Sequence, residues 1–107
     1  MANTSVPDVI PSMLVQEDPT FADLVEEFVD SLAHRIRNMK DAVQKGDFAT
    51  LRTLAHQLKG SGGGHGYPII TETAAAIEQH ARNEDLQQCG TGVEKLASIT
   101  ARVVIYP

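Results

Sequence analysis

The chain has 107 residues, of which 42% are hydrophobic and 21% charged, and its formal net charge is −5. This length and balance fit one globular domain, so we treat residues 1–107 as a single, monomeric domain. The net acidity argues against nucleic acid as a partner, because phosphate backbones are bound by a concentrated basic surface. No apolar run reaches the length of a membrane span, and residues 1–7 lack the features of a signal peptide, so we expect a cytoplasmic protein that does not bind membranes.

The first expected elements are a short segment and a long helix. Residues 6–15 predict a short helix, interrupted near Pro11, that covers one end of the core. Asp18 is a suitable N-cap and Pro19 suits a first helical position, so a long helix should begin there. Its apolar residues recur at steps of three and four, namely Phe21, Leu24, Val25, Phe28, Val29, Leu32, Ile36, Met39 and Val43.

A tight reversal and a second long helix should follow. Gly46 can take the left-handed conformation that ends a helix, and Asp47 can cap a new helix that starts at Phe48. The end of this helix is ambiguous, because each interior glycine costs about 1 kcal/mol relative to alanine. Propensity alone would end it near Lys59, whereas Gly62 and its neighbours would then lie in a loop.

Two more helices complete the expected fold. One runs from Pro68 to about Asn83, and the next begins at Leu86 and carries Cys89 on its apolar stripe. Cys89 is the single cysteine, so we interpret it as a small buried residue of a reducing compartment. Residues 103–107 form a short apolar tail that either frays or packs as a last turn.

The predicted fold class is all-α. None of the four long helices can bury its apolar stripe alone, and the connections between them are short. We therefore expect an antiparallel up-down-up-down four-helix bundle over residues 18–107, with residues 1–17 as an N-terminal capping segment that includes a short helix.

The segment from Ala55 to Gly66, AHQLKGSGGGHG, is the most informative part of the chain. On a helix, His56 lies roughly 150° from the centre of the apolar stripe and so points to solvent. Gly60 and Gly63 follow one and two turns later, and their lack of side chains lets another backbone or a bulky anion approach the imidazole. Arg52 lies on the same face and is a candidate partner-binding residue together with these two glycines.

The charge pattern near His56 has two interpretations. Residues 1–33 contain seven acidic side chains and no lysine or arginine, whereas residues 34–59 contain six basic side chains and two acidic ones. The basic segment is either a solvated surface with local ion pairs or a patch that attracts an acidic partner or a phosphoryl group. The sequence alone leaves both open.

The motif His56-x-x-Lys59-Gly60, with Gly63 and Gly66 after a long acidic helix, resembles the histidine-containing phosphotransfer (HPt) domains of two-component phosphorelays. The resemblance implies that His56 accepts and donates a phosphoryl group, that Lys59 balances its charge, and that Gly60 and Gly63 let a receiver domain dock. It also implies that the helix continues past Lys59. The implied partners are response-regulator receiver domains or a hybrid sensor histidine kinase, and Mg²⁺ is expected on the receiver rather than on this chain.

Elementary chemistry agrees with this resemblance. A neutral imidazole attacks phosphorus without a general base, and transfer from an aspartyl phosphate depends on positioning and on nearby cations. The glycine run is not a phosphate-binding P-loop, because Lys59 precedes Gly60 whereas the P-loop lysine follows a glycine. We therefore expect a phosphotransfer intermediate with no ATP-dependent kinase activity and no cofactor of its own.

Two alternatives remain for the same sequence. A histidine-kinase dimerisation bundle also carries an exposed acceptor, but there the histidine is normally followed by an acid and a downstream proline, which the Gln57-Leu58-Lys59 segment lacks. A non-catalytic docking bundle would keep the fold without using His56.

The other three histidines receive structural interpretations. His65 falls on the buried side of the helix, where we expect a core or hinge histidine with one hydrogen-bond partner. His34 and His80 are expected at the surface. The histidines and carboxylates lack the spacing of a metal site, so no bound metal is expected.

Overall fold

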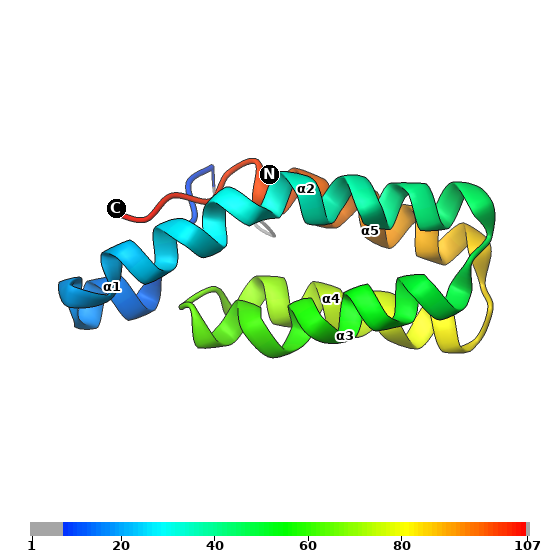
Figure 1. The fold of residues 1–107 in the computed structure, drawn as a ribbon, viewed down its shortest axis with the longest axis horizontal. Coiled ribbons are helices and arrows are strands. Elements are labelled where there is room, and N and C mark those ends of the chain that lie inside the picture. The colour runs from blue at the N-terminus through cyan, green and yellow to red at the C-terminus, as the bar shows by residue number, and fades with distance from the viewer. Residues whose placement is uncertain (1–7, 107) are drawn as a thin grey trace, which may run out of the picture.

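A computed structural model describes residues 8–106 of the chain, and within this range four long helices form a bundle. α2 lies along α5 on one side of the bundle and α3 lies along α4 on the other (Figure 1). The α2–α3 and α4–α5 pairs close the arrangement, which confirms the predicted antiparallel four-helix bundle. The elements in chain order are α1 (Met13–Glu17), the 3₁₀ helix η1 (Pro19–Phe21), α2 (Ala22–Lys45), α3 (Phe48–Gly64), α4 (Pro68–Arg82) and α5 (Leu86–Thr100).

The core is mainly aliphatic, and every long helix contributes to it. The buried face of α2 carries the 3.6-residue periodicity predicted from the sequence, and Cys89 of α5 is fully buried as expected. The largest fully buried side chains are Tyr67, Met39, Leu51, Leu58, Ile70, Ile77, Leu96 and Ile99.

The start of α2 differs slightly from the prediction. Asp18 accepts a hydrogen bond from the Thr20 N–H at 3.1 Å, and Pro19 occupies the first helical position, but the turn that they begin is the 3₁₀ helix η1. The α-helix itself begins at Ala22. Short 3₁₀ turns are common at the N-termini of α-helices, and here the turn capped by Asp18 leads directly into α2.

The predicted reversal between the two long helices is confirmed. Gly46 has φ 65° at the end of α2, and its N–H donates to the carbonyl groups of the preceding turn. Asp47 then accepts from the Thr50 N–H at 3.1 Å and caps α3. Glycine and aspartate at these two positions satisfy the backbone groups that adjoining helix ends leave unpaired.

The N-terminal segment covers one end of the core, as expected, and it does so by packing on the turn between α3 and α4. The Ser12 hydroxyl donates to the His65 carbonyl at 2.7 Å, and the Met13 N–H donates to the Gly66 carbonyl at 2.9 Å. Gly66 has φ 94°, and a Cβ there would collide with Ser12. The short helix does not span Pro11, however, because α1 begins at Met13 after its Ser12 cap. Val6 and Pro7 of the predicted segment lie outside the described residues.

The C-terminal tail neither frays nor forms a last helical turn. Val103 pairs with Ile10 in an isolated parallel bridge, in which the Ile10 N–H donates to the Arg102 carbonyl and the Val104 N–H donates to the Ile10 carbonyl, both at 2.9 Å. The Tyr67 hydroxyl also donates to the Val104 carbonyl at 2.7 Å. The extended segment before α1 thus offers backbone partners that the local sequence of the tail does not reveal. Pro107 lies outside the described residues.

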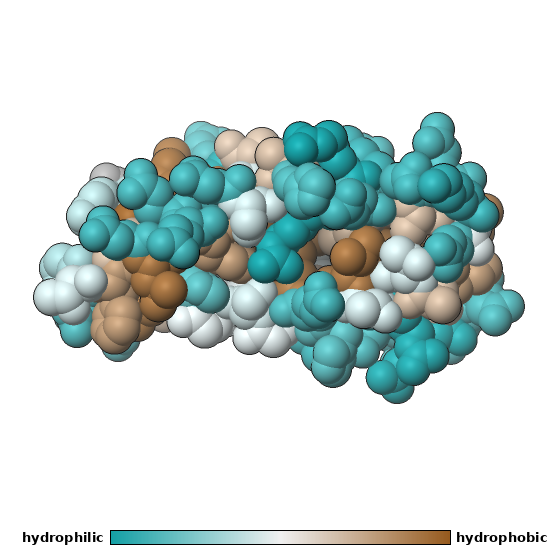
Figure 2. All heavy atoms as spheres, in the orientation of Figure 1, coloured by the Kyte–Doolittle hydropathy of each residue, from teal (hydrophilic) through white to brown (hydrophobic). Residues whose placement is uncertain are grey.

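One end of the molecule exposes apolar side chains. Figure 2 shows them gathered where α1 and η1 lie, whereas hydrophilic side chains cover most of the rest of this face. The exposed large hydrophobic residues of these elements and of the first turn of α2 are Met13, Phe21 and Leu24.

The glycine-rich end of α3 remains helical through Gly64. Helix propensity alone predicted an end near Lys59, and this prediction is wrong. The family resemblance implied that the helix continues past Lys59, and this is confirmed. Gly62 is buried, and a Cβ built on it would lie 2.8 Å from Cγ2 of Ile70 in α4. This glycine thus allows α3 and α4 to approach closely, which offsets its low helix propensity.

Thr71 of α4 also holds this end of α3. Its hydroxyl accepts from the Gly63 N–H at 2.7 Å and donates to the Lys59 carbonyl at 2.8 Å. The Gly63 N–H and the Lys59 carbonyl are four residues apart, the spacing of a hydrogen bond within an α-helix. The Thr71 hydroxyl, from the neighbouring helix, therefore links these two groups of α3.

Thr71→Val should therefore destabilise the protein. The variant keeps the side-chain shape but leaves two backbone groups without this partner, so we expect the free energy of unfolding to fall by about 1 to 2 kcal/mol. Urea denaturation followed by circular dichroism measures this loss. Thr53→Val on the exposed face of α3 is the control and should change stability by less than about 0.5 kcal/mol. Equal losses in the two variants would contradict the bridging role.

Candidate functional site

His56 stands at the middle of α3 with its imidazole directed outward. The side chain is 66% exposed, which confirms the orientation predicted from the helical periodicity. Its Nδ1 atom lies 2.9 Å from Oε2 of Glu78, which belongs to α4. The ring is therefore accessible to a partner and held at one nitrogen.

Glu78 joins three side chains into one cluster. Its carboxylate is only 7% exposed, and it contacts Nδ1 of His56, Nζ of Lys59 at 2.6 Å and Nη2 of Arg82 at 3.3 Å. The hydrogen bond from Lys59 is the main reason that the pKa of Glu78 falls to about 2, with a smaller contribution from His56 and against the opposing effect of burial. Glu78 is therefore ionised at neutral pH. We call these four residues the Glu78 cluster.

The ionised carboxylate selects one form of the neutral imidazole. A carboxylate only accepts hydrogen bonds, so Nδ1 of His56 must carry the proton that it shares with Glu78. The neutral ring then has its lone pair on Nε2, the nitrogen that Glu78 does not contact. The cluster thus leaves a nucleophilic nitrogen on the exposed part of the ring.

Sequence reasoning missed Glu78, because the carboxylates look scattered along the chain. One signal could have found it. Glu78 lies one turn after Ala74 and one turn before Ala81, on the apolar stripe of α4, and a charged residue on a buried stripe requires a partner. Arg82 follows Glu78 by one turn and was also not among the candidates.

The remaining predicted site residues lie on one surface of α3. Gly60 is exposed, and a Cβ built on it would meet nothing within 4 Å, so the expected bare surface beside His56 is present. Gly63 is exposed too, but its Cβ would lie 3.2 Å from Thr71 Oγ1, so this glycine also serves packing. Arg52 is exposed one turn before His56. The functional roles of these residues remain predictions.

The other histidines occupy different surroundings. His65 is half-buried and stacks on Phe28 with ring centroids 4.2 Å apart, and its Nδ1 lies 2.7 Å from the Ser61 carbonyl oxygen. This agrees with the predicted core or hinge role. His34 is exposed as predicted, whereas His80 is half-buried beside a groove between α4 and α5. Across residues 8–106, no group of three or more potential ligand side chains could hold a metal ion.

The fold and the site together define the class of protein: a helical bundle with an exposed histidine at the middle of one long helix. The family model for the Hpt domain matches residues 23–104, which is more than half of the chain, so the chain belongs to the Hpt domain family. Hpt domains carry phosphoryl groups on histidine in two-component phosphorelays together with receiver domains and histidine kinases. The comparisons with curated proteins and with solved structures gave no match. Among the described helices, none combines the length and apolar character that crossing a membrane requires.

The lowered pKa of Glu78 predicts a pH-dependent stability. Its ordinary value is 4.5 and its folded value about 2, so the contribution is complete above about pH 5. As the pH falls from 4.5 towards 2, the unfolded chain binds the proton first and the contribution is lost. Relative to Glu78→Gln, the wild-type protein should thus lose about 1 kcal/mol of stability between pH 6 and pH 3.

Urea denaturation at several pH values measures this difference. Glu72→Gln on the exposed face of the same helix is the control, and its stability should follow the wild-type curve. A constant difference between wild type and Glu78→Gln over this pH range would contradict the ion pairing of Glu78.

Proposed function

We propose that this protein is a phosphorelay intermediate in which His56 accepts a phosphoryl group from a receiver-domain aspartyl phosphate and passes it to the aspartate of another receiver. The observation that carries the proposal is the contact between His56 Nδ1 and the buried, ionised Glu78, which leaves Nε2 of an exposed imidazole as the nucleophile.

The transfer step follows from this arrangement. The Nε2 lone pair attacks phosphorus, an N–P bond forms, and the P–O bond to the receiver aspartate breaks, so the aspartate leaves as a carboxylate with the electron pair. The proton on Nδ1 stays in place. The imidazole becomes positively charged as it attacks, and the Glu78 carboxylate 2.9 Å from Nδ1 stabilises that charge. The reverse steps deliver the phosphoryl group to the next receiver.

Lys59 has two roles in this proposal. Its ammonium lies one turn from His56 and adds positive charge beside the incoming phosphoryl group. Its 2.6 Å contact with Glu78 also keeps that carboxylate in position for His56. Transfer by positioning and charge balance requires neither a nucleotide nor a general base, so the protein acts as a carrier and not as a kinase.

The partner supplies the remaining chemistry. The open surface at Gly60 and the exposed backbone at Gly63 give a receiver domain room to reach the imidazole, and Arg52 adds a contact on the same face. The receiver contributes Mg²⁺ for its own aspartate, and this chain brings no cofactor. We further propose that the protein is a cytoplasmic monomer.

Phosphoryl labelling tests the acceptor. The wild-type protein should gain one acid-labile phosphoryl group, seen by intact mass measurement, only when a phosphorylated receiver domain is supplied. His56→Gln should abolish the gain, because the nucleophilic nitrogen is removed, and His34→Gln is the matched control that should label normally. Failure of the wild-type protein to label would favour a docking bundle, and labelling by ATP alone would favour a kinase.

Removal of the Lys59 charge tests the proposed role of this residue. Lys59→Ala should slow transfer from the receiver about tenfold, because one cation near the phosphoryl group is lost and Glu78 is held less firmly. Rapid-quench measurement of the transfer rate checks this, and circular dichroism should show unchanged helicity. Lys59→Arg should restore part of the rate. An unchanged rate in Lys59→Ala would exclude the proposed role.

A further inference from the structure

Charged side chains form a regular stripe on the exposed side of α2. Its members are all exposed and follow one another at steps of three and four residues, so they lie on one face of the helix: Glu26, Asp30, Ala33, Arg37 and Lys40. We call these residues the α2 stripe. The stripe is acidic before Ala33 and basic after it, so its two halves have opposite charge and are separated by a small residue.

The charges of the α2 stripe make few contacts within the chain. Across residues 8–106, the side chains of Glu26, Asp30 and Lys40 make no hydrogen bond or ion pair. Nη2 of Arg37 lies 3.4 Å from Nδ1 of His34, which is a long contact at the surface. These charges are therefore available to a partner.

The α2 stripe borders a groove between α2 and α5. One hollow of this groove, about 380 Å³ in volume, is lined largely by apolar and small side chains, including Ala33 of α2 and Ala101 of α5, and Arg37 lies on its wall. A second hollow of about 430 Å³ lies further along the same two helices, with Lys40 and Glu94 on its walls. Small residues let another helix approach closely, and the apolar lining gives it surface to bury.

A second copy of α2 in antiparallel orientation matches the α2 stripe charge for charge. With a rise of about 1.5 Å per residue, Asp30 and Arg37 lie about 5 Å on either side of the point midway between them. Reversing a second α2 about that point brings Asp30 of each copy opposite Arg37 of the partner subunit. Glu26 and Lys40 of the partner subunit then lie within about 1.5 Å of one another along the axis. A two-fold axis therefore forms each ion pair twice, as in an isologous interface.

The charges also select the orientation of the two helices. Each chain has a net charge of −5, so two copies repel one another unless opposite charges meet at the contact. A parallel arrangement would place Asp30 against Asp30 and Arg37 against Arg37, and like-charge repulsion opposes it. The α2 stripe attracts a second copy of itself only in the antiparallel orientation.

We propose that two copies of this chain associate reversibly through the α2–α5 face, with their α2 helices antiparallel. The inference goes beyond the proposed function, because α3 and α4 carry the site and lie on the other side of the bundle (Figure 1). His56 of each copy stays open to a receiver domain in this arrangement. Transfer needs one copy, so the monomer of the proposed function is the form at low concentration, and the dimer forms as the concentration rises.

Sedimentation equilibrium at low salt and increasing protein concentration tests the association. The wild-type protein should shift from monomer to dimer, and added salt should weaken the dimer because exposed ion pairs are screened. Arg37→Asp and Asp30→Arg should each weaken association about tenfold, since each replaces two ion pairs by like-charge contacts. Circular dichroism should show unchanged helicity in both variants, because both positions are exposed.

Exchange of the charges tests the antiparallel pairing itself. An equimolar mixture of Arg37→Asp and Asp30→Arg should form heterodimers, because every aspartate at these positions of one variant again meets an arginine of the other. The double variant that combines Asp30→Arg with Arg37→Asp should recover dimerisation, since both pairs are kept in reversed order.

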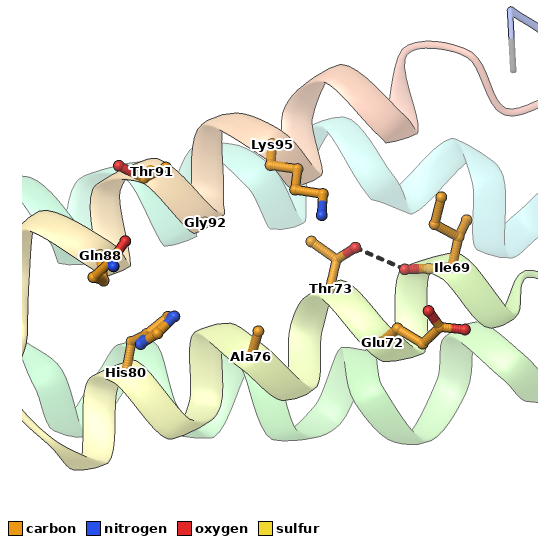
Figure 3. Close-up of a pocket in the computed structure, with 9 residues that line it drawn as sticks. All are labelled: Ile69, Glu72, Thr73, Ala76, His80, Gln88, Thr91, Gly92 and Lys95. Atoms are coloured by element: carbon orange, nitrogen blue, oxygen red, sulfur yellow. Dashed lines mark hydrogen bonds between the residues drawn. The ribbon is translucent and has the colours of Figure 1, made fainter. Parts of the chain in front are cut away.

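The groove between α4 and α5 provides matched controls. It has a volume of about 460 Å³, and Figure 3 shows Glu72 of α4 and Lys95 of α5 among the residues that line it. Lys95→Glu and Glu72→Arg change the net charge by the same amounts as Arg37→Asp and Asp30→Arg, but they lie outside the α2 stripe. Both controls should dimerise like wild type.

The inference is overturned if the wild-type protein sediments as a monomer at every concentration, if Arg37→Asp and Asp30→Arg dimerise like wild type, or if their mixture stays monomeric. The first result would leave the α2–α5 face to a different protein. None of these results bears on the phosphoryl labelling of His56, which remains the separate test of the proposed function.

Discussion

The buried carboxylate of Glu78 is the constraint on which the site depends. A carboxylate that is only 7% exposed must be paired, because an unpaired buried charge is strongly destabilising. Lys59 and His56 from α3 and Arg82 from α4 provide the partners, so the helix pair and the site are held by the same contacts. The imidazole is consequently fixed in orientation before any partner arrives, which is the condition for efficient transfer by positioning.

The close packing of α3 and α4 makes this cluster possible. Gly62 brings the two backbones together against Ile70, and Thr71 bridges the helical hydrogen bond between Lys59 and Gly63. The glycines after His56 therefore have different roles: Gly62 is required by the packing of α3 on α4, whereas Gly60 leaves the surface beside His56 open. A run that looks like a helix breaker in isolation is stabilised by the neighbouring helix.

Local charge and net charge have opposite signs in this protein. The chain is acidic overall, with seven acidic side chains in residues 1–33, yet the charged side chains around His56 are three cations, Arg52, Lys59 and Arg82, and one anion, Glu78. At physiological salt, interactions between exposed charges are screened beyond about 8 Å, so the charges nearest to His56 dominate the local electrostatic potential. In the proposed function, this arrangement lets an acidic protein receive an anionic phosphoryl group at His56.

The sequence by itself determined the features that depend on neighbours within one helical turn. The amphipathic stripe of α2, the Gly46–Asp47 reversal and the outward orientation of His56 follow from periodicity and capping, and the structure confirms them. Only the tertiary structure showed why the glycine-rich end of α3 stays helical to Gly64, that the tail pairs with Ile10, and that Glu78 holds His56 from 22 residues away. These features depend on contacts between segments that are far apart in the sequence. The packing of the helices brings such segments together, and spacing within one helix does not predict it.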